Sequence, residues 1–217
     1  MDNYKKGQRA YDKKDYVKAA SFWKPLAERG HLQAIRSMGN MYFSGDAEPT
    51  CLPEDYDKAL YYFRLGSLKS DAHCLYMLAH FYKSGFGVKR DIHRARQLYS
   101  RSSEQGNSKA MYFLALTYYY DDYNPDYKKA YYWLNRSAQL GFSSAHYYLS
   151  EMRLYGCGAK NDFTEAYKHW ILFDCDTDKN IFIEELYRKV KKAVKPMHIF
   201  MAEHLAKEYI EKYNVKV

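Results

Sequence analysis

The amino-acid sequence predicts an all-α protein: a right-handed α/α solenoid of about five helix-turn-helix repeats, closed by C-terminal capping helices. Two observations predict this fold class. First, a short pattern recurs five times along the 217 residues: a lysine or other polar residue, an alanine, and then an aromatic or large apolar residue three or four positions later. Second, apolar residues within each repeat are spaced by three and four, as on one face of a helix. A fixed period of this length indicates stacked hairpins of two helices.

The alanine of this pattern marks the second helix of each predicted repeat. Lys18-Ala19 precedes Phe22 in the first repeat, and Glu165-Ala166 precedes Trp170 in the fifth. Successive alanines are separated by 40, 36, 35 and 36 residues. The full set is Ala19, Ala59, Ala95, Ala130 and Ala166.

The first helix of each following repeat is marked by another small residue. It is Ala34, Cys74, Ala110 or Ala145, and an apolar residue followed by a small one comes four and five positions later. Small residues at this spacing allow two antiparallel helices to pack closely, so each unit is expected to be a helical hairpin. These later pairs are Met38-Gly39, Leu78-Ala79, Leu114-Ala115 and Leu149-Ser150.

The predicted helix ends agree with this register. Gly30, Gly106 and Gly141 follow the second helices, where glycine can adopt the left-handed conformation that ends a helix. Aspartate favours the position just before a helix, because its side chain accepts a hydrogen bond from a free backbone N–H. The candidate N-cap or first-turn residues are Asp15, Asp91 and Asp162.

The two ends of the chain differ in their patterns. Residues 2–12 are expected to form the first helix of the first repeat, with Gly7 and Ala10 at the small positions. Beyond residue 177 the repeat pattern is lost, although apolar residues at helical spacing continue and a final helix is expected after Pro196. We therefore predict a solenoid at residues 1–177 and a helical cap at 178–217 packed on it, as a single structural domain. The apolar stripe of the cap is Ile183, Leu186, Tyr187, Val190 and Val194.

The repeat pattern resembles the Sel1-like repeat family, a subclass of tetratricopeptide-like solenoids. Residues 74–106, CLYMLAHFYKSGFGVKRDIHRARQLYSRSSEQG, and residues 145–170 carry a small-residue helix, a loop with glycines that ends in Asp91 or Asp162, and the alanine helix. The resemblance covers about residues 2–175. It implies a protein that organises complexes. Two loops depart from the pattern, because 45–54 is lengthened and 121–127 lacks glycines.

The cysteines and the longest apolar run indicate where in the cell the protein is expected. The longest apolar run, residues 111–120, is too short to span a bilayer, so we expect no membrane insertion. Without a CxxC pair the cysteines are interpreted as free thiols, and a cytoplasmic protein is expected. Cys157 and Cys175 would lie too far apart along a helix for a disulfide. The four cysteines are Cys51, Cys74, Cys157 and Cys175.

A search for catalytic chemistry identifies no site. The eight histidines are scattered, and no serine-histidine-aspartate, phosphate-loop or dinucleotide signature is present. His73 and His80 could share a helix face, but two histidines make a poor metal site, and they are interpreted as solvated side chains. Cys74 is expected to be buried and inert. The sequence thus predicts no enzyme activity, no cofactor and no metal.

The predicted partner surface follows from the repeat register. In tetratricopeptide-like folds the first helix of each hairpin lines a concave face, and one outward-facing position is almost always tyrosine here. Tyrosine provides a large contact area at low rotamer cost and is enriched at interface hot spots. The alternative is that these rings pack against one another. The predicted partner-binding residues are Tyr4, Tyr11, Arg36, Asn40, Phe43, Tyr76, His80, Lys83, Tyr112, Tyr119, Tyr147 and Glu151.

Three functions remain open at this point. The first is a non-catalytic adaptor or scaffold that binds a partner protein or peptide in the concave groove. The second is an inhibitor or immunity-type protein that neutralises one enzyme. The third is nucleic-acid binding, motivated by the net charge of +8, the 25 tyrosines and a basic stretch near the C-terminus. That stretch could equally be the solvated face of the cap; it comprises Arg188, Lys189, Lys191, Lys192 and Lys195.

Overall fold

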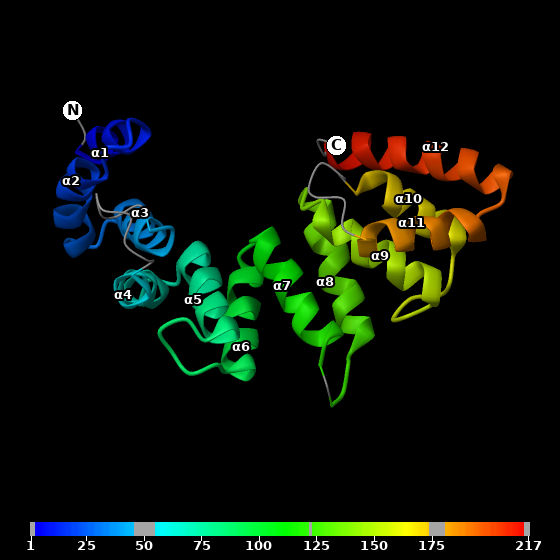
Figure 1. The fold of residues 1–217 in the computed structure, drawn as a ribbon, viewed down its shortest axis with the longest axis horizontal. Coiled ribbons are helices and arrows are strands. Elements are labelled where there is room, and N and C mark those ends of the chain that lie inside the picture. The colour runs from blue at the N-terminus through cyan, green and yellow to red at the C-terminus, as the bar shows by residue number, and fades with distance from the viewer. Residues whose placement is uncertain (1–2, 46–54, 122, 174–180, 215–217) are drawn as a thin grey trace. The chain divides into compact units, whose positions relative to one another are not determined.

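The computed structural model describes residues 3–45, 55–121, 123–173 and 181–214, and these parts of the chain form helices and connecting turns (Figure 1). The helices are α1 (Asn3–Asp12), α2 (Tyr16–Glu28), α3 (Leu32–Phe43), α4 (Tyr56–Leu68), α5 (Ala72–Ser84), α6 (Ile92–Glu104), α7 (Ser108–Tyr119), α8 (Tyr127–Gln139), α9 (Ser144–Tyr155), α10 (Phe163–Leu172), α11 (Ile181–Ala193) and α12 (Pro196–Tyr213).

The helices pair in sequence as five hairpins, which confirms the predicted fold class. The pairs α1–α2, α3–α4 and α5–α6 belong to an N-terminal unit, Met1–Gln105. The pairs α7–α8 and α9–α10 belong to a C-terminal unit, Gly106–Val217, together with α11 and α12. Within each unit the second helix of one hairpin packs on the first helix of the next. The prediction of a single structural domain with a boundary at residue 177 stays a prediction.

The small residues of the predicted register lie at the centre of the helix contacts. Each of the five alanines of the second helices and each of the four small residues of the first helices is fully buried. Gly39 and Gly66 show why size matters, because an added Cβ would overlap the ring of Phe63 and the Sγ of Cys74 respectively. The repeat therefore depends on small side chains where two helices cross.

Helix ends follow the predicted capping chemistry. The side chains of Asp15, Asp91 and Asp162 each accept a hydrogen bond from the backbone N–H three residues later, which confirms them as N-caps. After the second helix of the second hairpin stands Ser70, where the first, third and fourth hairpins have glycine. Ser70 adopts a left-handed φ of 55°, close to the φ of 82° at Gly30, so the turn geometry is kept without glycine.

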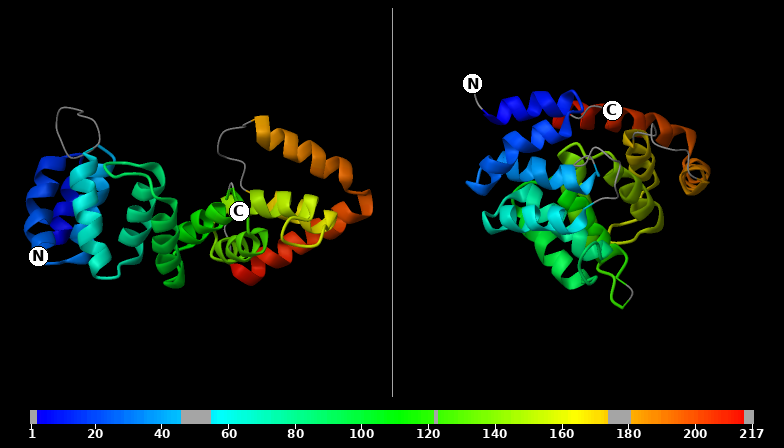
Figure 2. Two further views of the ribbon diagram at one scale, coloured as in Figure 1. Left: turned by 90° about the horizontal axis from the view of Figure 1, so that it is seen from below. Right: turned by 60° about the vertical axis from the view of Figure 1, so that its left-hand side comes forward.

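The predicted C-terminal cap consists of α11 and α12. Leu186, Val190 and Val194 are buried in one cluster with Leu154 of α9 and Ala166 of α10. Helix α12 begins with Pro196 in its first turn and packs along α10. The two capping helices meet at a corner around residues 194–195, seen at the orange end of the C-terminal unit (Figure 2).

Replacing Ala110 or Ala145 by leucine is expected to lower the free energy of unfolding by about 1–3 kcal/mol, because the extra atoms overpack a closed helix contact. Chemical denaturation of each variant measures this loss. Lys109→Leu is the matched control, since Lys109 is exposed on the same helix as Ala110. Unchanged unfolding of both alanine variants would contradict the register.

Candidate functional site

The predicted residues of α1 contribute to the core of the first hairpin. The ring of Tyr4 stacks on Trp23 with the centroids 5.9 Å apart, and Tyr11 lies 5.6 Å from the same indole. The hydroxyl group of Tyr4 also lies 3.2 Å from the Oγ of Ser37 on α3. Both tyrosines are half-buried, so only part of each ring is open to a partner.

Arg36 and Asn40 connect the first helices of neighbouring repeats. The Nε of Arg36 donates to both carboxylate oxygens of Asp71 at 2.9 Å, and its Nη2 forms a further contact with Asp71. Burial alone would raise the pKa of Asp71, but hydrogen bonds from Arg36 and the backbone N–H of Cys74 lower it. Asn40 Oδ1 lies 2.9 Å from the Nε2 of His73. These contacts hold α3 beside α5.

Phe43 and His80 pack against each other at the same end of α3 and α5. Their ring centroids lie 6.1 Å apart, and Phe86 of the following loop contacts both rings. Burial, together with the charge of Lys83, lowers the pKa of His80. The interpretation of His80 as a solvated side chain is therefore wrong: aromatic rings surround its imidazole, which is half-buried.

Tyr76 and Cys74 have different environments on α5. The half-buried ring of Tyr76 lies 6.2 Å from that of Tyr99, and burial raises its pKa. Cys74 is fully buried, which confirms the prediction, and burial raises the pKa of its thiol. Cys51 and Cys175 lie outside the described residues, as does the rejected pairing of Cys175 with Cys157.

In the C-terminal unit, four tyrosines of α7 and α9 and the tyrosine that follows α7 form one group. We call this group the tyrosine cluster; it comprises Tyr112, Tyr119, Tyr120, Tyr147 and Tyr148. Tyr148 is central, with ring centroids 5.8 Å from Tyr112, 5.5 Å from Tyr119 and 5.1 Å from Tyr147. The hydroxyl group of Tyr120 donates to that of Tyr148 at 3.3 Å. Three predicted residues are thus brought together by a tyrosine that the sequence analysis did not select.

Glu151 places a carboxylate at the edge of the tyrosine cluster. The hydroxyl group of Tyr119 donates to its Oε2 at 3.0 Å. Burial, followed by the charge of Glu151, raises the pKa of Tyr119, so this phenol stays neutral and remains a donor. The cluster can therefore offer ring faces, hydroxyl groups and one negative charge. It presents no nucleophile with an adjacent base, and the described residues contain no group of three or more metal-ligating side chains.

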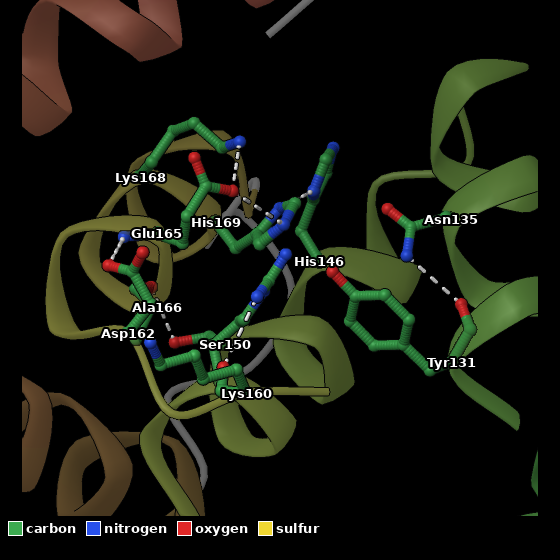
Figure 3. Close-up of polar contacts among 11 residues, drawn as sticks. Tyr131, Asn135, His146, Ser150, Lys160, Asp162, Glu165, Ala166, Lys168 and His169 are labelled. Carbon is green, nitrogen blue, oxygen red and sulfur yellow. Dashed lines mark hydrogen bonds and ion pairs between the residues drawn. The ribbon is translucent and has the colours of Figure 1, made fainter. Parts of the chain in front are cut away.

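A buried histidine pair, His146 of α9 and His169 of α10, was missed by the sequence analysis. Their Nδ1 atoms lie 2.9 Å apart, and both side chains are almost completely inaccessible (Figure 3). One imidazole must therefore donate its Nδ1–H to the bare Nδ1 of the other. The Nε2 of His146 is buried without a hydrogen-bond partner among the described residues, and its ring contacts Tyr209 of α12 at 5.3 Å.

The repeat register contains the signal that could have identified this pair. His146 occupies the position of Ile35, Leu75 and Met111 in the preceding repeats, all of which are buried. His169 occupies the position of Leu98 in the third repeat, which is also buried. Polar residues at two apolar positions of one hairpin indicate that the two side chains satisfy each other.

The basic stretch lies on α11 and at the corner after it. The Nη2 of Arg188 lies 3.4 Å from the carboxylate of Glu184, and the Nζ of Lys189 lies 2.7 Å from that of Glu185. Each pair joins residues one helical turn apart. Two of the five basic residues are thus balanced by carboxylates of their own helix, which reduces the positive charge available to nucleic acid.

In the parts of the chain that the structure describes, every helix is too short or too polar to cross a bilayer.

Comparisons with known proteins agree with the repeat register. A family model described as Sel1 repeat matches residues 3–31, 32–71, 72–107, 108–142 and 143–172. A curated relative from Candida glabrata, the ERAD-associated E3 ubiquitin-protein ligase component HRD3, is 27% identical over 95 residues. This match covers 44% of the present chain and 10% of HRD3, so the chain spans only a small part of that relative.

Two solved structures share the fold. A Sel1 repeat protein from Oxalobacter formigenes has a TM-score of 0.74 and 16% identity, with 97% of this chain and 98% of that chain covered. The immunity protein Pa5087 from Pseudomonas aeruginosa has a TM-score of 0.53 and 14% identity, with 97% and 84% covered. Five helical hairpins, the buried small residues and the five matched repeats together show that the chain belongs to the Sel1 repeat family.

Proposed function

We propose that this protein is a non-catalytic adaptor that binds a partner protein through the tyrosine cluster and Glu151. Sel1 repeat proteins generally mediate interactions between proteins and are generally non-catalytic scaffolds, which supports this class of function. The observation that carries the proposal is the grouping of four tyrosines around Tyr148 beside a carboxylate. The concave groove and the cytoplasmic location stay predictions.

The tyrosine cluster suits a binding surface because its rings are already ordered. Each ring is held by edge-to-face contacts with its neighbours, so little side-chain freedom is lost when a partner binds. Tyr120 is 61% exposed, and the remaining four rings are half-buried. Ordered tyrosines with open edges and hydroxyl groups are typical of interface hot spots.

Glu151 indicates the chemistry of the partner at this point. It is half-buried and accepts a hydrogen bond from Tyr119, so its charge is less screened than that of a fully exposed carboxylate. A lysine or arginine of the partner would pair with the carboxylate and lie against a tyrosine ring. We therefore infer a partner segment that inserts a basic side chain beside Tyr119 and Tyr147.

The double variant Tyr147→Ala/Glu151→Gln is expected to weaken partner binding by about tenfold or more, since it removes a ring and the charge. The partner is first captured from nuclease-treated lysate, then purified, and its affinity is measured by calorimetry. Tyr132→Ala is the matched control, because Tyr132 is 52% exposed on α8 and lies outside the tyrosine cluster. Circular dichroism of each variant checks that the fold is retained.

Two results would contradict this proposal. Equal affinity of the wild-type protein and the double variant would show that the partner binds elsewhere. Capture of nucleic acid alone from untreated lysate, lost after nuclease treatment, would favour the nucleic-acid hypothesis over the adaptor.

An inhibitor of one enzyme is the second candidate function. Pa5087, an immunity protein, has the same fold along nearly all of this chain, although at 14% identity the likeness concerns the fold alone. The same capture experiment separates the two candidates. An inhibitor would capture an enzyme and abolish its activity at equimolar concentration, whereas an adaptor would leave its partner active.

A further inference from the structure

The outward face of the first half of α12 is apolar. Met197, Phe200 and Met201 are 74%, 75% and 48% exposed, and their spacing of three and four places them on one side of the helix. The opposite side contains Ala202 and Ala206, which are buried where α12 packs along α10. A helix packed on one face normally keeps its other face polar, so a second apolar stripe requires an explanation.

Lysine residues precede this apolar stripe along the chain. Of the five lysine or arginine residues in segment 186–202, Arg188 and Lys189 pair with Glu184 and Glu185 of the same helix, which leaves the three lysines nearest the stripe. Lys191 and Lys192 occupy the last turn of α11, and Lys195 directly precedes α12; all three are exposed. The stripe begins two residues after Lys195, so the lysines and the apolar residues lie close to the corner at which the two helices meet.

The lysines next to the apolar stripe favour one kind of binding partner for the corner over another. A second copy of the chain packed through the same stripe would bring Lys191, Lys192 and Lys195 of both copies together, and like charges at such an interface oppose association. The stripe consists of three exposed side chains on one side of a single helix, close to the corner. A flat anionic surface with an apolar interior accepts such projections without needing a complementary groove.

We propose that the α11–α12 corner docks on an anionic membrane surface. Met197, Phe200 and Met201 enter the boundary between headgroups and acyl chains, while Lys191, Lys192 and Lys195 contact acidic lipid headgroups. The protein lies on the membrane and no helix crosses it. This inference does not depend on the tyrosine cluster, whose residues are unchanged in the variants below.

Co-sedimentation with lipid vesicles tests the proposal. The wild-type protein is expected to bind vesicles of phosphatidylcholine mixed with phosphatidylserine, to bind phosphatidylcholine alone much more weakly, and to lose binding as salt is raised. Met197→Glu/Phe200→Glu and Lys191→Gln/Lys192→Gln/Lys195→Gln are each expected to reduce binding by at least about tenfold. Every substituted side chain is exposed, so circular dichroism should be unchanged.

Matched controls show whether the effect belongs to this corner. Leu68→Glu makes the same kind of change at a residue of α4 that is 83% exposed. Lys5→Gln/Lys13→Gln/Lys24→Gln removes three exposed lysines of the N-terminal unit. Both controls are expected to bind anionic vesicles as the wild type does.

Several outcomes would overturn the proposal. Absence of wild-type binding to anionic vesicles would do so, as would equal loss in the control and corner variants. Self-association that Met197→Glu/Phe200→Glu abolishes, without vesicle binding, would assign the stripe to a second copy. Binding of RNA that needs the three lysines but not Met197 and Phe200 would assign the charge to nucleic acid.

Discussion

Acidification from pH 7 to pH 4 is expected to destabilise the C-terminal unit by about 3 kcal/mol or more through the buried pair of His146 and His169. Burial, followed by the charge of Lys168, lowers the pKa of His146 to about 3. Burial, then the charges of His146, Lys168 and Arg153, lowers the pKa of His169 well below its usual value. An imidazole in the unfolded chain titrates near about 6.5, so the unfolded state binds more protons below that pH.

The sign of this effect follows from the shared hydrogen bond. The contact between the two Nδ1 atoms needs one bare nitrogen, and protonation of both rings would place two N–H groups against each other. The stabilisation is therefore fully present above about pH 6.5 and is lost as the pH falls toward about 3. Glu165, 3.9 Å from the Nε2 of His169, favours a charged ring, but its carboxylate is already paired with Lys168 at 2.5 Å.

The pH dependence can be assigned to the pair with one variant. His146→Met/His169→Leu introduces the side chains found at the corresponding positions of two other repeats, Met111 of the fourth and Leu98 of the third, and should fold. Urea denaturation from pH 7 to pH 4, with hydrogen exchange to locate the change in α9 and α10, should show a flatter dependence than in the wild type. His204→Leu, at an exposed position, should not differ from the wild type. Equal pH dependence of the double variant and the wild type would contradict the prediction.

The fold could be predicted from sequence because the repeats use the same small residues for the same contacts. Ala19 and its counterparts are buried in every hairpin. The spacing of these alanines in the sequence was therefore sufficient to predict which helices pack together. Even Ser70, which breaks the glycine pattern, retains the left-handed turn. A pattern that recurs in five repeats predicts the fold even where one repeat departs from it, which a single motif could not do.

The candidate sites were less predictable, because they depend on where the repeats differ. Tyr148 occupies a position held by Ser37, Met77 and Phe113 in other repeats, so no period marks it as the centre of the tyrosine cluster. The contacts between the rings also depend on side-chain rotamers and on the angle at which the helices cross, and neither can be read from the spacing of residues in the sequence. His146 and His169 did carry a signal, since each interrupts an apolar position of the register. Comparing repeats for their exceptions would have found the histidines but not Tyr148.

Arg36→Ala is expected to lower the free energy of unfolding of the N-terminal unit by about 2–3 kcal/mol, although Arg36 was predicted as a partner-binding residue. Asp71 has a side chain that is 2% exposed, compared with 43% for Arg36. Removing the arginine would leave a buried carboxylate with only the backbone N–H of Cys74 as a partner among the contacts described above. Most of the lost stability would come from leaving the carboxylate of Asp71 buried without an opposite charge, and less from losing the attraction between Arg36 and Asp71.

Repeating the substitution in an Asp71→Asn background separates the two roles of Arg36. Asparagine caps a helix about as well as aspartate, so Asp71→Asn keeps the N-cap of α5 and removes the buried charge. In that background Arg36→Ala should cost less than about 1 kcal/mol, as chemical denaturation of the four proteins in the cycle would show. Equal costs in both backgrounds would mean that the pair contributes little, and Arg36 would then be available for a partner. A cost confined to the Asp71 background would instead make Arg36 a structural connection between α3 and α5, and any binding defect of Arg36→Ala would have to be corrected for lost stability.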